Sequence, residues 1–125
     1  MAITLKKIQR KNPQNTAVSK WYLTQVSAGS VGLSEISKEI EKRSALSLGD
    51  VQSTLSNLVE VLPLFLKLGQ SIRLEGFGTF RISVSSAGTE TAEELSARQV
   101  NGVKILFLPS AELKRNMGDI SFELE

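Results

Sequence analysis

Leu74-Glu75-Gly76-Phe77-Gly78-Thr79-Phe80 is the stretch that decides the fold, because two glycines flank an aromatic residue between segments of alternating hydrophobicity. Glycine permits a positive φ angle or a close approach of two backbones, which a tight hairpin requires. Apolar and polar residues alternate in residues 72–75 before this turn and in residues 80–85 after it. We therefore predict two half-buried antiparallel strands joined at this turn.

The composition of the chain argues against enzymatic chemistry. The 125 residues are 41% apolar, which is enough for the core of one domain. With no cysteine and no histidine, the chain lacks a thiol nucleophile, an imidazole base and the usual zinc ligands. Gly76 and Gly78 lie between strands rather than before a helix, so they predict no phosphate-binding loop. We expect a protein that is not an enzyme and that uses no cofactor, metal ion or small-molecule substrate.

The hydropathy of the chain predicts a cytoplasmic protein without a membrane partner. No uninterrupted apolar run approaches the roughly 20 residues that span a bilayer. The N-terminus lacks the charged-then-apolar pattern of a secretory signal.

Basic residues are concentrated at the N-terminus although the net charge is only +2. Residues 1–34 carry five lysines and arginines and no acid, whereas residues 110–125 carry two basic and four acidic residues. The basic cluster Lys6, Lys7, Arg10 and Lys11 has two interpretations: a solvated strand face, or contact with the phosphates of a nucleic acid.

Two helices are predicted before the glycine hairpin. Apolar residues recur at helical spacing from residue 33, which predicts an amphipathic helix ending near residue 44. Ser47 can cap the next helix, and the Asp50 side chain can accept a hydrogen bond from the Ser47 amide as in a capping box. Pro63 lies inside this second helix, so we expect a kink or a break there. Gly69 suits a left-handed C-terminal cap.

Strands are also predicted at both ends of the chain. Residues 3–6 and 21–26 have strand-like patterns and are separated by the polar loop of residues 12–15. Alternation in residues 120–125 predicts a terminal strand with one acidic face. That strand could pair with the basic strand of residues 3–10, with lysines facing glutamates.

The apolar surface of these elements favours a homodimer. The helices have broad apolar faces, and a thin three-stranded sheet cannot cover them in one chain. Residues 103–108 are apolar at nearly every position, which predicts a strand covered on both faces.

The order of these motifs resembles the HU and integration host factor family of bacterial DNA-architectural proteins. An apolar helix ends at Gly69, the glycine hairpin follows, and Phe107-Leu108-Pro109-Ser110-Ala111-Glu112-Leu113-Lys114 comes next. The extra terminal segments make the chain more similar to the longer, extended HU-like proteins. The resemblance implies an α+β fold with two N-terminal helices, a three-stranded antiparallel sheet with an arm region, a short C-terminal helix and added terminal strands. It also implies an intertwined dimer that binds, bends or packages double-stranded DNA in the nucleoid.

On this basis the chain divides into three segments of one compact domain. Residues 1–32 form an N-terminal strand extension, residues 33–117 form the HU-like DNA-binding domain, and residues 118–125 form the C-terminal strand.

The arm region departs from the family pattern toward less positive charge. Ser83 and Ser85 stand where family members carry arginines, and residues 107–111 lack two lysines of the family pattern. Residues 86–102 contain no proline to wedge between base pairs, and they carry three glutamates and one arginine. The arm would leave the body after residue 84 and return before residue 103; alternatively, residues 92–99 form a short helix or a cap on the body.

The candidate DNA-binding residues are the cations of the sheet, the arm and the last helix, together with the N-terminal basic cluster. Such cations would contact the DNA backbone without reading bases. Each has a structural alternative, such as a cross-strand ion pair for Arg73 or a favourable helix C-terminus for Lys114 and Arg115. The candidates are Arg73, Arg81, Arg98, Lys104, Lys114, Arg115, Lys6, Lys7, Arg10 and Lys11, and the hairpin motif is Gly76, Phe77, Gly78 and Phe80. The alternative function is an HU-fold dimer that serves protein interaction or assembly.

Overall fold

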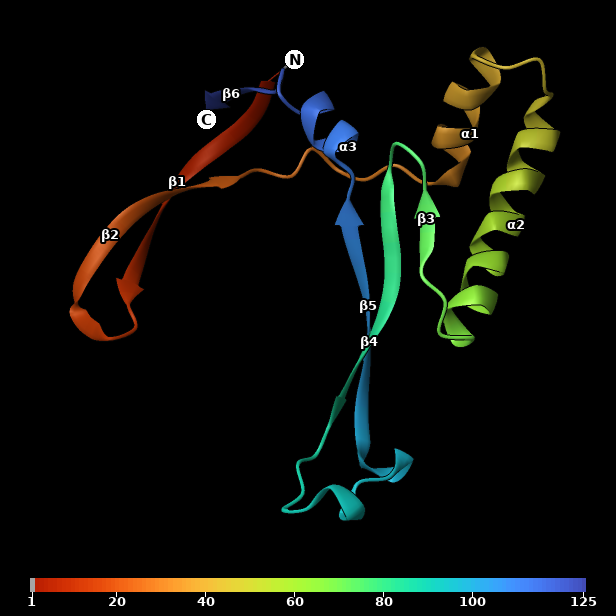
Figure 1. The fold of residues 1–125 in the computed structure, drawn as a ribbon. Coiled ribbons are helices and arrows are strands. Elements are labelled where there is room, and N and C mark those ends of the chain that lie inside the picture. The colour runs from red at the N-terminus through yellow and green to blue at the C-terminus, as the bar shows by residue number, and fades with distance from the viewer. Residues whose placement is uncertain (1) are drawn as a thin grey trace. The chain divides into compact units, whose positions relative to one another are not determined.

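The computed structural model describes residues 2–125 and contains both helices and strands in two compact units. The first unit combines the chain up to Gly32 with Met117–Glu125, and the second is Leu33–Asn116. Each unit has its own three-stranded sheet, shown in Figure 1. The mixed α+β class predicted from the sequence is confirmed.

The first unit is a sheet of strand order β2-β1-β6. Its hairpin consists of β1 (Ala2–Asn12) and β2 (Asn15–Gln25), which pair antiparallel. The Asn12 side chain accepts a hydrogen bond from the Gln14 amide at 2.9 Å, which holds the turn. The predicted pair of strands with a polar loop is confirmed, although β2 begins earlier than expected.

The C-terminal strand β6 (Ser121–Leu124) pairs with β1 in parallel. The register places Phe122 opposite Ile3 and Leu124 opposite Leu5, so the predicted pairing of the two chain ends is confirmed. Glu123 lies opposite Thr4 rather than a lysine, and no salt bridge joins these two strands within residues 2–125. The expectation that lysines face glutamates is therefore wrong: the apolar pairs determine the register.

Deleting residues 119–125 should lower the melting temperature of the first unit by several degrees. The deletion removes the β6 ladder, in which each backbone hydrogen bond contributes about 1 kcal/mol. Trp21, the only tryptophan of the chain, lies in β2 of the same sheet and reports unfolding by its fluorescence. Glu123→Gln keeps the ladder and should shift the melting temperature by no more than about 2 °C. An unchanged transition after the deletion would show that β6 does not support the sheet.

The second unit begins with helices α1 (Leu33–Lys42) and α2 (Leu48–Lys67). Ser47 caps α2 as predicted, since its hydroxyl accepts a hydrogen bond from the Asp50 amide at 3.1 Å. The helix continues through Pro63, so of the expected kink or break the break is wrong. Proline removes one amide, the donor to the carbonyl of Val59, and α2 runs on to Lys67 despite this loss.

The end of α2 follows the glycine signal in the sequence. Gly69 has a φ of 80°, and its amide donates to the Leu66 carbonyl at 3.0 Å. The Gln70 amide donates to the Phe65 carbonyl at 3.2 Å, which completes a Schellman motif. The chain then turns directly into the second sheet.

The second sheet has the order β3-β4-β5 and is antiparallel throughout. Its strands are β3 (Ile72–Leu74), β4 (Gly78–Ser86) and β5 (Val100–Pro109), and α3 (Ala111–Asn116) follows. The predicted glycine hairpin joins β3 to β4: Gly76 has a φ of 79°, and the Phe77 amide donates to the Leu74 carbonyl at 2.9 Å.

The core of the second unit is small. Val51 and Leu66 of α2 are its buried apolar residues, and Ser37 of α1 is buried with its hydroxyl bonded to the Leu33 carbonyl. The rings of Phe77, Phe80 and Phe107 also form a cluster, with neighbouring centroids 4.8–6.4 Å apart.

Strand β5 is not covered on both faces in the single chain, contrary to the sequence prediction. Val103 and Ile105 are 62% and 67% exposed, and Leu108 is exposed as well. The apolar residues of β5 thus form a surface that the helices of this chain do not cover.

Strands β4 and β5 continue beyond the helices as a two-stranded ribbon, seen in Figure 1. Val84 pairs with Val103 and Ser86 with Val100, so the chain leaves and returns where the arm was expected. The tip contains two 3₁₀ turns, η1 (Ala92–Glu94) and η2 (Ala97–Gln99). These turns lie at the end of the ribbon, away from α1 and α2, so residues 92–99 form no cap on the helices.

Candidate nucleic-acid interface

The strand register places three predicted cations on one face of the second sheet. Arg73 lies opposite Thr79, Arg81 lies opposite Leu106, and Lys104 lies opposite Ser83. Because directly paired residues share a face and alternate residues return to it, all three side chains project from the same side. We call this side the cationic face, defined by the exposed residues Arg73, Arg81 and Lys104.

The opposite face of the same sheet is apolar. The alternation that places the cations on one side puts aromatic and branched side chains on the other. We call this side the apolar face; its residues are Ile72, Leu74, Phe80, Ile82, Val84, Val103, Ile105 and Phe107. The cationic face is mixed rather than purely polar, because Leu106 and Leu108 lie on it beside the cations.

The charges of the cationic face are only partly compensated. Arg73 Nε lies 3.4 Å from Glu75 Oε1, and both side chains are mostly exposed, so this ion pair contributes little stability. Its partner is on the same turn rather than across the hairpin, which differs from the expected cross-strand pair. No salt bridge engages Arg81 or Lys104 in the described part of the chain.

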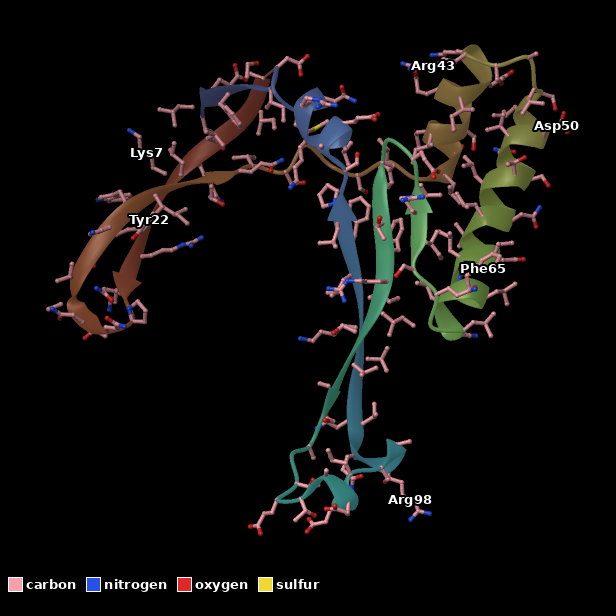
Figure 2. All side chains as sticks on the ribbon, in the orientation of Figure 1. Lys7, Tyr22, Arg43, Asp50, Phe65 and Arg98 are labelled. Atoms are coloured by element: carbon pink, nitrogen blue, oxygen red, sulfur yellow. The ribbon has the colours of Figure 1, made fainter. Side chains whose placement is uncertain are left out.

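The tip of the ribbon has the opposite charge balance. Arg98 lies in η2, where Ser96 and Gln99 form a capping box, and Figure 2 shows its side chain at the end of the ribbon. Glu90, Glu93 and Glu94 share this tip, so its formal charge is negative. A polyanion would be repelled here and attracted along the cationic face.

Lys114 and Arg115 occupy the last turn of α3, directly after β5. Ser110 caps this helix, since its hydroxyl accepts from the Leu113 amide at 3.0 Å. Both basic side chains are exposed, and their position at a helix C-terminus is favourable for cations in any case.

The register of the first sheet separates the N-terminal cations. Lys6 and Arg10 project from one face of β1, and Lys7 projects from the other. Arg10 lies directly opposite Lys20 of β2, a residue that the sequence prediction omitted from the site. The register shifts between Lys11 and Asn12, next to the turn. A regular ladder that continued from the turn would give Arg10 another partner. The sequence pattern therefore does not predict that Arg10 and Lys20 face each other.

The two glycines of the hairpin motif act in different ways. Gly76 supplies the positive φ of the turn. A Cβ on Gly78 would lie 2.5 Å from the Leu108 carbonyl oxygen and 2.6 Å from the Phe107 ring, so Gly78 permits close strand contact. The motif positions the cationic face and supplies no ligand-binding group of its own.

No group of three potential metal-ligating side chains is found in residues 2–125. None of the helices that the structure describes is long and apolar enough to cross a membrane.

Comparisons with known proteins agree with this geometry. The family described as "HU domain fused to wHTH, Ig, or Glycine-rich motif" (HU-HIG) matches residues 1–124. A provisionally assigned bacterial DNA-binding protein from Bacteroides vulgatus ATCC 8482 has a similar structure, with a TM-score of 0.69 and 10% identity. That match covers 98% of this chain and 48% of the Bacteroides chain. This chain therefore spans about half the length of that protein.

A second similar structure is HU from Anabaena, crystallised with DNA. The TM-score is 0.56 and the identity is 11%, and the match covers 71% of this chain and 99% of the Anabaena chain. At such low identity these two structures establish a shared fold. A search of curated proteins finds no match.

Proposed function

The chain belongs to the family of HU domains fused to a wHTH, Ig or glycine-rich motif, and from this we propose that it binds double-stranded DNA. Binding takes place through the phosphate backbone, with little preference for sequence, and bends or packages the duplex in the nucleoid. We assign this function to the HU-like domain of residues 33–117.

The observation that carries the proposal is the cationic face. Arg73, Arg81 and Lys104 project from the same side of the second sheet, and two of them have no ion-pair partner in the described chain. Lysine and arginine side chains that neutralise phosphates release counterions from DNA, which supplies sequence-independent affinity. Lys114 and Arg115 add positive charge where β5 enters α3.

The composition of the tip favours DNA contact along the sides of the ribbon rather than insertion of the tip between base pairs. The tip carries three glutamates and one arginine, and residues 86–102 hold no proline that could insert between base pairs. The cations that remain are suited to contact phosphates, and such contacts position a duplex without reading its bases.

We also propose that the chain is a homodimer. Val84, Val103 and Ile105 on the apolar face are all more than 60% exposed. Val59 and Leu64 of α2 are exposed as well. Exposed apolar surface of this extent is typical of an interface.

Sedimentation equilibrium at micromolar concentration should give twice the 13.6 kDa mass of one chain. The Val103→Asp/Ile105→Asp variant places two charges on the apolar face, so it should shift the mass toward one chain. Thr89→Asp/Thr91→Asp adds the same charge at the tip and should remain dimeric. A monomeric wild-type protein would contradict the proposal.

Assembly without DNA is the alternative function, favoured by the glutamates of the tip and by the large apolar face. Fluorescence anisotropy with a labelled random duplex of about 30 base pairs in about 50 mM salt separates the two. Phosphate contacts are strong under these conditions, so DNA binding should be readily detected. Absence of binding together with a stable dimer would favour assembly.

A further inference from the structure

The hairpin of the first unit has two chemically different faces. One face carries Leu5, Trp21, Leu23, Phe122 and Leu124 together with Lys7 and Lys11, because directly paired residues lie on the same side. The other carries Lys6, Arg10 and Lys20, with Tyr22 between them. We call these four residues the basic hairpin face. Figure 2 labels Tyr22 from this face and Lys7 from the opposite face.

Two cations on the basic hairpin face oppose each other directly. Arg10 pairs with Lys20 across the strands, and like charges in such positions destabilise a sheet. No salt bridge to either side chain is found in residues 2–125, and residues 1–34 contain no acid. The acid on this face, Glu123, lies opposite Thr4 near the other end of β1. The repulsion between Arg10 and Lys20 is therefore not relieved within the sheet.

The surroundings of Arg10 suit an anionic ligand. Its guanidinium lies 5.8 Å from the centroid of the Tyr22 ring, and this contact orients the group without neutralising its charge. A shallow hollow of about 380 Å³ lies beside it, lined by Arg10, Lys11, Asn12, Pro13, Lys20 and Tyr22. A planar guanidinium beside a lysine ammonium is a favourable pair for the oxygens of a phosphate.

We infer that the basic hairpin face is a second surface that binds the phosphate backbone of double-stranded DNA. This surface shares no residue with the cationic face. Its key residue Lys20 is identified by the strand register and not by the sequence pattern. The choice of DNA as ligand rests on the proposed function. The opposite face also carries Lys7 and Lys11, but each lies opposite an uncharged residue, Leu23 and Ser19. A directly opposed pair of cations is therefore a property of the basic hairpin face.

The test compares full-length variants by fluorescence anisotropy on a random duplex of about 30 base pairs. Arg10→Gln/Lys20→Gln removes both opposed charges. Lys38→Gln/Lys67→Gln removes the same total charge from exposed positions of α1 and α2 and serves as the control. Arg10→Lys/Lys20→Arg keeps both charges. The emission of Trp21, which neighbours Lys20 but projects from the other face, verifies that the hairpin is folded.

The Arg10→Gln/Lys20→Gln variant should lose about tenfold in affinity, and its slope of log affinity against log salt should fall by about 0.9 per lost contact. The control and the charge-retaining variant should stay within about twofold of wild type. The melting temperature of the hairpin should not fall, since a like-charge pair has been removed.

Two other results have distinct meanings. Wild-type affinity in Arg10→Gln/Lys20→Gln, or an equal loss in the control, would overturn this inference and leave the proposed function standing. A wild-type protein that does not bind DNA at all would overturn the proposed function, and with it the ligand assigned to this face.

Discussion

Gly78→Ala should destabilise the second unit by about 3 kcal/mol, the largest effect on stability expected of a single methyl group in this chain. The added Cβ would lie 2.5 Å from the Leu108 carbonyl oxygen. That oxygen belongs to the backbone of β5, which is paired with β4 at Thr79, so it cannot move without disturbing the ladder. The Phe107 ring, 2.6 Å away, would also have to leave its contact with Phe80.

The same substitution at Gly88 provides the matched control. Nothing lies within 4 Å of a Cβ built there, and its backbone φ lies outside the left-handed region. Gly88→Ala should therefore change the free energy of unfolding by no more than about 0.5 kcal/mol. Urea denaturation followed by circular dichroism, at one protein concentration, measures both values. Equal stability of the two variants would show that β4 and β5 do not approach each other as closely as described.

Arg81→Gln/Lys104→Gln should weaken DNA binding more than any other pair of substitutions. Both residues lie on the cationic face without a salt-bridge partner in residues 2–125, so their charge is available to phosphates. Each lost contact lowers the slope of log affinity against log salt by about 0.9, which amounts to nearly 4 for two residues in each protomer of a dimer. At about 50 mM salt the affinity should fall on the order of a hundredfold.

Lys38→Gln/Lys67→Gln again controls for the loss of total charge, because it lies on α1 and α2 rather than on the sheet. Anisotropy titrations at several salt concentrations give the slope for each protein. The substituted residues of the sheet variant and of the helix control are all exposed. Both variants should therefore keep the wild-type melting temperature within a few degrees. If the sheet variant and the helix control lose affinity equally, the cationic face has no special role in binding.

Local features of the fold were predictable because they depend on single residues. Ser47 and Gly69 delimit α2 through hydrogen bonds to adjacent backbone groups, and Gly76 provides the one conformation that the β3–β4 turn needs. Alternation in residues 120–125 predicted β6; its pairing with β1 was also predicted, although not the residues that face each other. The resemblance carried by the hairpin and its flanking segments led to the family that the comparisons confirm.

Features that depend on strand register or on the surroundings of a residue were not predictable. The register irregularity after Lys11 leaves Arg10 opposite Lys20, and neither residue alone signals it. Pro63 was expected to kink or break α2, yet the helix continues to Lys67, because one missing amide does not end a helix of 20 residues. Val103 was expected in a strand covered on both faces but is exposed in the single chain, because an apolar sequence does not specify what covers it.

The most direct test of the account is the salt dependence of wild-type binding to two random duplexes of unrelated sequence, measured between about 50 and 200 mM salt. Binding through the phosphate backbone predicts equal affinities for the two duplexes and a steep, linear fall of log affinity with log salt. Affinity that does not change with salt, or no binding at about 50 mM, would contradict a DNA-backbone role for this chain.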